Sequence, residues 1–295
     1  MASFKEVLTE NARIVTDELD RLLPNEDGPE ARLMEAVRYA TLSAGKRIRP
    51  FLVMNSAHLF NVSEESAMRV AAAVEMVHCY SLVHDDLPSM DDDELRRGQP
   101  TCHVRFGEAT AILAGDGLLT KAFEVLAEDP THSDPRVRGE LVVEMSRAIG
   151  IEGMVGGQML DLLAEENSLC VNEITRLQRL KTGMLIGFSC ESGAILGKAA
   201  EPARHALLAY AHDLGLAFQI ADDLLDVEGS EEEVGKKTGK DASAGKATFV
   251  SLLGRERARA QADMLAGQAV EHLGMFEEKA EHLRELAKFV VKRRA

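Results

Sequence analysis

The chain has 295 residues, of which 45% are apolar and 28% are charged, a balance typical of globular proteins and too apolar for a disordered chain. Its formal net charge of −15 argues against a general binder of nucleic acid or anionic membranes, because such a protein needs a basic face. An anionic small substrate stays open, provided that its site gathers metal ions or a tight cluster of Lys and Arg.

Helical periodicity recurs along the whole chain. Ser63, followed by two glutamates, fits the start of a long helix, and Pro88 fits its end. The apolar pattern predicts helices over 3–23, 30–43, 64–87, 107–128, 135–149, 172–197, 202–227, 246–271 and 276–292, with a further one that has Pro50 in its first turn. Loops are expected over 88–106, 129–134, 150–157, 164–171, 197–201 and 228–245.

Alternating runs of strand type are nearly absent, and no linker or solenoid repeat separates the chain into parts. We therefore expect one all-α domain over 1–295. The glycine run at 150–157 breaks a surface helix, and it also fits a bend or a close approach between helices.

The N-terminal segment and the cysteines indicate the compartment. Residues 1–15 contain early acidic residues and no long apolar core, so no signal peptide is expected. No run of 18 apolar residues occurs, so no membrane span is expected. The cysteines form no C-x-x-C pair and fit buried, reduced thiols of a cytoplasmic protein; they are Cys79, Cys102, Cys170 and Cys190.

The first candidate site is the segment 84–98, HDDLPSMDDDELRRG, which has five Asp and one Glu within ten positions. Asp85 and Asp86 come at the end of a predicted helix, and Asp91 follows the turn at Pro88. Crowded carboxylates raise each other's pKa unless a cation holds them. Hard oxygen ligands point to Mg²⁺. A solvated acidic loop explains this segment equally well when it is taken alone.

The second candidate site is the segment 218–229, FQIADDLLDVEG. Asp222 and Asp226 are four apart and share one helix face with Gln219. Most residues around them are apolar, and buried carboxylates are costly without partners. A solvated face explains this helix less well, because it would carry Lys and Arg between the acids. Two such motifs that face each other could hold several Mg²⁺ ions around a diphosphate.

Basic residues form a weaker signal. Lys46, Arg47 and Arg49 lie between a Gly and a Pro and fit an anion site at a helix start, although a solvated loop is the usual explanation of a short basic run. His78 precedes Asp85 by seven residues and so shares its helix stripe, but a lone His is more often a core residue. Nothing but the resemblance described next singles out Lys181 and Thr182.

Taken together, the motifs resemble the trans-isoprenyl diphosphate synthase family, most closely its bacterial farnesyl diphosphate synthases. The resemblance runs from about residue 40 to residue 255 in the family's order. It rests on 45-GKRIRP-50, 75-EMVHCYSLVHDD-86, 85-DDLPSMD-91, 96-RRGQPT-101, 156-GGQMLDL-162, 181-KTG-183, 218-FQIADD-223, 222-DDLLD-226, 235-GKKTGKD-241 and 245-GKATF-249. Glu94 departs from the Asp expected in close relatives, outside the metal positions.

The resemblance implies a helical bundle that forms a homodimer and condenses isopentenyl diphosphate with an allylic diphosphate, head to tail. It implies up to three Mg²⁺ ions: two on Asp85 and Asp91, with Asp86 nearby, and a third on Asp222, supported by Asp226. It assigns the allylic diphosphate to Arg96, Lys181, Lys236 and Lys246. It assigns isopentenyl diphosphate to Lys46, Arg49, His78 and Arg97. Thr182 and Gln219 would direct their dipoles at the developing carbocation.

Product length should be set on the helix before the first motif. Ser81 lies one turn before Asp85, about 6 Å along the axis, and the ring of its neighbour Tyr80 can stop growth at fifteen carbons. Tyr80 can equally be an ordinary core aromatic. Geranyl or geranylgeranyl diphosphate is the close alternative product.

A terpene cyclase or a non-catalytic partner subunit fits less well, because both aspartate motifs and both arginines at 96–97 are present. Segment 228–245 is the expected lid, because water must be excluded from a carbocation.

Overall fold

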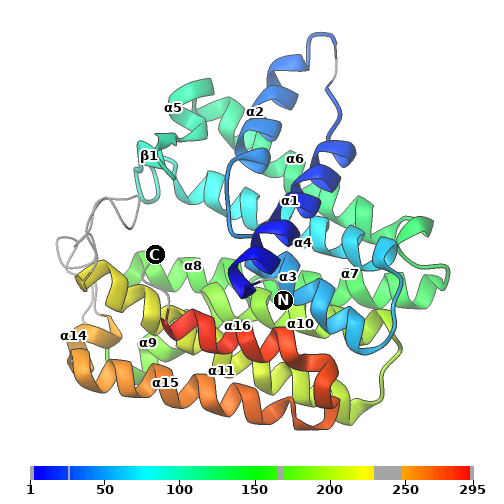
Figure 1. The fold of residues 1–295 in the computed structure, drawn as a ribbon. Coiled ribbons are helices and arrows are strands. Elements are labelled where there is room, and N and C mark those ends of the chain that lie inside the picture. Colours follow the sequence, from blue (N-terminus) through cyan, green and yellow to red (C-terminus); the bar gives the residue numbers. More distant parts are fainter. Residues whose placement is uncertain (1–2, 26, 165–168, 229–247, 293–295) are drawn as a thin grey trace. The chain divides into compact units, whose positions relative to one another are not determined.

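The computed structural model describes residues 3–25, 27–164, 169–228 and 248–292. Within these ranges the regular secondary structure is helical, apart from one hairpin of two short strands (Figure 1). The all-α class predicted from the sequence is confirmed.

The chain divides into two compact units, Met1–Met54 with Val62–Val142, and Asn55–Asn61 with Val143–Ala295. The single domain expected from the sequence stays a prediction.

The first unit is built around one buried helix and contains a hairpin, β1 paired with β2. Its elements are α1 (Phe4–Leu22), α2 (Ala31–Leu42), α4 (Glu64–Asp85), β1 (Leu95–Arg96), β2 (Gln99–Pro100), α5 (Cys102–Phe106), α6 (Glu108–Ala127) and the 3-10 turn η1 (Asp129–Thr131). Two helices have one end in each unit: α3 (Ile48–Leu59) and α7 (Pro135–Ile149).

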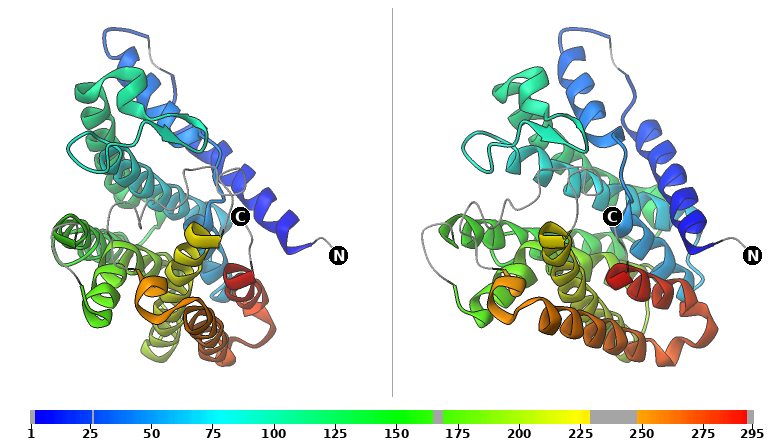
Figure 2. Two further views of the ribbon diagram at one scale, coloured as in Figure 1. Left: turned by 90° about the vertical axis from the view of Figure 1, so that its left-hand side faces the viewer. Right: turned by 60° about the vertical axis from the view of Figure 1, so that its left-hand side comes forward.

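Helix α4 is the core of the first unit. Ser63 caps its start by accepting a hydrogen bond from the backbone of Ser66, and two glutamates occupy its first turn, as predicted. The run from Val70 to Val77 is completely buried, because small and β-branched side chains allow α6 to lie along it, as both figures show (Figures 1 and 2). The helix ends at Asp85, three residues before Pro88, so the first aspartate motif begins where a buried helix stops.

The second unit is organised around α11, the long helix that carries the second aspartate motif. Helices α10 and α15 pack along it, and α15 runs beside it in Figures 1 and 2. The elements of this unit are α8 (Met154–Ala164), α9 (Val171–Gln178), the π-helical segment η2 (Arg179–Gly183), α10 (Met184–Leu196), α11 (Glu201–Glu228), α14 (Phe249–Leu253), α15 (Arg255–His272), the 3-10 segment η3 (Gly274–Ala280) and α16 (Glu281–Lys292).

Several predicted boundaries were wrong where a short-range signal competed with packing. The expected loop 88–106 contains the hairpin and α5, and the expected loop 150–157 contains the start of α8. Gly254, with a φ of +78°, separates α14 from α15 within the expected helix 246–271. The expected helix 276–292 begins as the 3-10 segment η3, whereas Pro50 lies in the first turn of α3, as predicted.

The expected helix 172–197 is interrupted by η2, which inserts extra backbone between α9 and α10. A glycine in the first turn of α8 explains the close packing there. A Cβ on Gly157 would lie 2.2 Å from the backbone nitrogen of Lys181, so α8 contacts η2 without a side chain between them. The close approach that the glycine run allowed is therefore confirmed.

None of the described helices is both long and apolar enough to cross a membrane. All four cysteines are free thiols, and Cys170 is the exposed one. Burial, the largest cause in each case, raises the pKa of Cys79 to about 12 and that of Cys102 to about 11. Burial also raises the pKa of Cys190.

Candidate active site

The chain turns back on itself at the first aspartate motif. Asp85 is the last residue of α4, and the backbone N–H of Asp91 donates to the carbonyl of Asp85 over 2.9 Å. Asp92 is held in the same turn by a bond from its N–H to the carbonyl of Leu87. The backbone of Asp91 therefore returns to the end of the helix, and two of the expected magnesium ligands belong to one turn.

Asp86, the second aspartate of this motif, is the counter-ion of Arg96. The guanidinium Nε of Arg96 lies 3.0 and 2.8 Å from the two carboxylate oxygens, and Nη2 lies 2.5 Å from Oδ1. Asp86 is 3% exposed. Burial opposes the charge of Arg96, but its hydrogen bonds with Asp86 and the charges of Asp86, Asp93 and Asp85 outweigh it and raise the pKa. Asp86 thus fixes an arginine that the family resemblance assigns to the allylic diphosphate.

Arg97 follows in the turn of the hairpin. Arg97 and Gly98 have φ values of +53° and +76°, the backbone of a two-residue turn that matches the twist of paired strands. The Nη1 of Arg97 donates to the carbonyl of Ala44 over 2.5 Å. A Cβ on Gly45 would lie 2.6 Å from the same Nη1, so the glycine of the GKR motif leaves space for this guanidinium.

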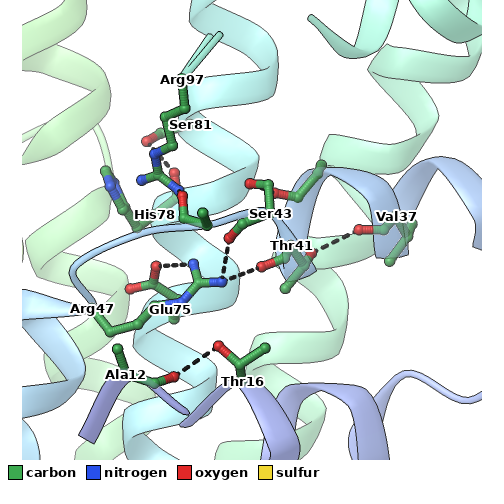
Figure 3. A network of polar contacts seen from close by, with 12 residues as sticks. Ala12, Thr16, Val37, Thr41, Ser43, Arg47, Glu75, His78, Ser81 and Arg97 are labelled. Atoms are coloured by element: carbon green, nitrogen blue, oxygen red, sulfur yellow. Dashed lines mark hydrogen bonds and ion pairs between the residues drawn. The ribbon is translucent and has the colours of Figure 1, made fainter. Parts of the chain in front are cut away.

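Arg47, the central residue of the basic cluster, is buried in an ion pair (Figure 3). Its Nη1 lies 2.6 Å from Glu75 of α4, and its Nη2 donates to the carbonyls of Thr41 and Ser43 over 2.7 and 2.8 Å. The side chains of Arg47 and Glu75 are 1% and 2% exposed. This arginine therefore joins the segment between α2 and α3 to α4, and it is not available to a substrate. The flanking Lys46 and Arg49 keep the predicted role in diphosphate binding.

His78 lies one helix turn beyond Glu75 on α4, with the side chain of Arg97 reaching toward it (Figure 3). Burial is the largest cause that lowers the pKa of His78 well below its ordinary value, and the positive charges of Arg49, Arg97, Arg96 and Arg47 lower it further. A neutral imidazole surrounded by guanidinium groups marks a locally positive region inside an acidic protein.

Tyr80 and Ser81 lie in the last turns of α4. The ring of Tyr80 is 7% exposed and meets the imidazole of His84 edge-on, with centroids 5.5 Å apart. His84 donates to the carbonyl of Ile112, and it occupies the space that the absent side chain of Gly115 leaves on α6. The small hydroxyl of Ser81 donates back to the carbonyl of His78. Tyr80 is therefore held by a packed neighbour.

In the second unit, Lys181 lies in the π-helical segment η2. Its ammonium is 2.6 Å from the carboxylate of Asp161 on α8, and both side chains are largely buried. Thr182 is its half-buried neighbour in the same segment. Segments of π-helix are often found at functional sites because the inserted residue changes which side chains share a face. Here the insertion and the contact with Gly157 together determine the position of Lys181.

The second aspartate motif occupies the last turns of α11. Asp222 and Asp226 are half-buried, and Gln219 lies on the same stripe, as the spacing predicted. The intervening Asp223 has a structural role. Its carboxylate accepts from the amide of Gln219 over 3.1 Å and from the backbone N–H of Phe249 over 3.0 Å. Asp223 therefore orients the glutamine and attaches the start of α14 to α11.

Two predicted residues, Lys236 and Lys246, lie outside the described residues, as does most of the expected lid. Two residues of α8 carry signals that the sequence reasoning did not use. Asp161 is the partner of Lys181, and both polar atoms of the Gln158 amide are buried without a hydrogen-bond partner among the described residues. The segment 156-GGQMLDL-162 was part of the resemblance, but nothing in its spacing specified either role.

The carboxylates fit the chemistry of Mg²⁺. Among the residues that the structure describes, no three His, Cys, Asp or Glu side chains gather as ligands of one ion. A hard cation such as Mg²⁺ needs no such cage, because it binds through one or two carboxylates and completes its shell with water and substrate phosphates. Asp85 with Asp91 in one turn, and Asp222 with Asp226 on one helix face, supply carboxylates in that number.

Comparison with known proteins gives one consistent family. The polyprenyl synthetase model matches residues 30–288. Farnesyl diphosphate synthase of Escherichia coli is 46% identical over 279 residues, which cover 92% of this chain and 91% of that protein. Geranylgeranyl diphosphate synthase of Cyanophora paradoxa is 40% identical over 287 residues, 97% and 95% of the two chains.

One solved structure is similar to this chain in both fold and sequence. An FPP/GFPP synthase from Zymomonas mobilis superimposes with a TM-score of 0.89 and 47% identity, over 98% of each chain. The family match spans most of this chain and includes the aspartate motifs of both units. The chain therefore belongs to the polyprenyl synthetase family, and it is a prenyltransferase.

Proposed function

We propose that this prenyltransferase condenses isopentenyl diphosphate with dimethylallyl or geranyl diphosphate and releases (2E,6E)-farnesyl diphosphate. Relatives named farnesyl diphosphate synthase support this product. The similar Cyanophora paradoxa protein, named for geranylgeranyl diphosphate, makes a longer product the main alternative, with geranyl diphosphate as the shorter one. We therefore rest the choice of product on Tyr80.

The charged residues divide by substrate. Arg96 and Lys181 bind the allylic diphosphate, with Lys236 and Lys246 as further cations. Lys46, Arg49, Arg97 and neutral His78 bind isopentenyl diphosphate, whose several negative charges require several donors. Asp86 and Asp161 hold Arg96 and Lys181 before the substrate arrives, so that these side chains do not have to be ordered at the moment of binding.

The reaction needs no nucleophilic side chain. The bond between C1 and the diphosphate oxygen of the allylic substrate breaks, and the electron pair leaves with the diphosphate. When bound on the aspartates, Mg²⁺ neutralises charge on this leaving group. The double bond of isopentenyl diphosphate attacks C1 through its C4, and a proton is then lost from C2 to the departed diphosphate. Thr182 and Gln219 direct their oxygen dipoles at the transient cation, and Asp223 holds Gln219 for this role.

Tyr80 carries the proposal for the product. Its ring lies more than one helix turn before Asp85, is nearly completely buried, and is fixed by His84. A prenyl chain that grows from the aspartates along α4 would meet this ring after a limited number of isoprene units. A rigid barrier at that distance favours fifteen carbons over twenty or more.

The test is the carbon number of the products with Mg²⁺, dimethylallyl diphosphate and isopentenyl diphosphate. We expect fifteen carbons from the wild-type protein and from Tyr80→Phe, which keeps the ring, and twenty or more from Tyr80→Ala. Circular dichroism establishes that both variants are folded. A fifteen-carbon product from Tyr80→Ala would contradict Tyr80 as the barrier, and a wild-type product of ten or twenty carbons would contradict the farnesyl assignment. Excess EDTA should abolish condensation in every variant.

A further inference from the structure

The hairpin that carries Arg96 and Arg97 is too small to hold its own shape. Each strand has two residues, and a two-stranded hairpin is marginal in water without further packing. Its turn places Arg97, a residue other than glycine, in the left-handed backbone conformation, which adds strain. A cavity of about 40 Å³ lies between the hairpin and α4, so packing alone does not fix the strands. The position of both arginines therefore depends on polar contacts.

Within the part of the chain that the structure describes, three such contacts attach the hairpin to the elements around it. Arg96 binds Asp86 at the end of α4, and Arg97 binds the carbonyl of Ala44 before α3. The third contact is the hydroxyl of Tyr39 on α2, which donates to the carbonyl of Pro100 over 2.6 Å. The first two contacts are made by the same guanidinium groups that bind diphosphate in the proposed function, so they change when the substrate binds. The Tyr39 contact does not.

Tyr39 is itself held in place. The guanidinium of Arg105 lies 4.3 Å from the centroid of its ring, a cation–π distance, and the ring of Phe106 meets it edge-on at 5.5 Å. Both residues belong to α5, which follows β2 directly. The hydroxyl is therefore presented to Pro100 by a ring with little freedom to turn. Pro100 pairs with Leu95 in the ladder, so an anchor on Pro100 restrains both strands.

We propose that Tyr39 is a positioning residue for the diphosphate-binding arginines: its hydroxyl holds the 95–100 hairpin in place while Arg96 and Arg97 bind substrate. This inference rests on the proposed role of Arg97 in binding isopentenyl diphosphate. Removal of the hydroxyl lets the hairpin shift, and the ordering of Arg97 must then be supplied during binding. The loss therefore falls on the binding of substrate and not on the chemical step.

The test compares Tyr39→Phe with the wild-type enzyme and with a matched control. Tyr39→Phe keeps the ring contacts with Arg105 and Phe106 and removes one hydroxyl. We expect KM for isopentenyl diphosphate to rise about three- to tenfold, as for one lost hydrogen bond, and kcat to stay within about twofold. Tyr210→Phe removes a similar bond, from its hydroxyl to the carbonyl of Leu283 in the second unit, and should lower the melting temperature without changing KM.

A double variant separates this inference from the proposed function. Arg97→Gln should raise KM by itself, and Tyr39→Phe should add nothing on that background, because the hydroxyl acts through the arginine. If the two substitutions multiply each other's effect on KM in the double variant, or if Tyr39→Phe alone leaves KM unchanged, the positioning role of Tyr39 is overturned. The function of Arg97 stays intact in either case. An unchanged KM in Arg97→Gln would overturn both.

Discussion

His78 shows at the scale of a residue how an acidic protein builds a positive site. Burial and four arginines keep the pKa of this imidazole well below 6.5, its ordinary value. As the pH falls through 6.5, the unfolded chain takes up a proton at His78 and the folded chain does not. The free energy of unfolding therefore decreases from about pH 6.5 downward, until the folded pKa is reached, and His78 contributes no pH dependence above 6.5.

This direction of the pH dependence can be tested by urea denaturation at pH 7.5 and pH 5.5. We expect His78→Asn to lose less free energy of unfolding between these two pH values than the wild-type protein, because the substitution removes a proton-binding site of the unfolded state. The control is His58→Asn, an exposed position in the last turn of α3, which should keep the wild-type difference. Equal differences for all three proteins would contradict the burial of a neutral His78.

The partners of single residues were the part of the site that the sequence could not specify. The basic cluster at 46–49 predicted an anion site, but nothing local showed that Arg47 would turn inward to Glu75, 28 residues along the chain. Asp86, expected near the metal ligands, is likewise paired with Arg96, and no local pattern indicated that partner. Ion pairs between distant segments depend on the tertiary fold, and spacing along one helix contains no information about them.

At the scale of elements, the contact between α8 and η2 determines where Lys181 lies. A Cβ at position 157 would overlap the backbone of residues 180 and 181, and backbone cannot rotate away as a flexible side chain can. The substitution Gly157→Ala must therefore move η2 relative to α8. Because small displacements of a catalytic group are costly, the proposed role of Lys181 predicts that kcat falls by about tenfold or more.

The matched control for this substitution is Gly117→Ala on α6. A Cβ there meets no atom within 4 Å, so the change should raise the free energy of unfolding by about 0.5–1 kcal/mol and leave kcat unchanged. Steady-state kinetics and thermal melting of both variants make the comparison. If Gly157→Ala kept wild-type kcat, the close contact would not be what positions Lys181.

The elements themselves were predictable where one signal dominated. Ser63, Pro88 and the apolar pattern between them predicted α4 to within two residues, because capping, burial and chain reversal agree there. Prediction failed for α8 and η2, where glycines that weaken an isolated helix are needed for close packing between helices. It failed again at the hairpin, whose strands are too short to show any alternation.

At the scale of the whole molecule, α8 presents an apolar stripe that the described chain does not cover. Val155, Met159 and Leu163 recur every four residues and are 47%, 52% and 43% exposed, and Ile151 extends the row. A continuous row of this kind is unusual on a monomer surface. We propose that it is part of the contact between two copies of the chain, in agreement with the homodimer expected from the sequence.

Light scattering after size-exclusion chromatography tests this proposal. Met159→Glu places a charge at the centre of the stripe, so we expect the molar mass to fall from two chains to one at micromolar concentration. Met275→Glu is the control, because Met275 is similarly exposed but lies in η3, away from the stripe. A dimer that survives Met159→Glu, or a wild-type monomer, would refute the contact.

The uneven burial of the four thiols has a practical consequence for following this protein in solution. Three of the cysteines combine burial with a raised pKa, so very little reactive thiolate forms on them at neutral pH. Cys170, the exposed one, precedes α9, the helix that leads into η2. A maleimide fluorophore or spin label should therefore attach to the native sequence at one position, and its signal would report on the segment that carries Lys181 without any engineered cysteine.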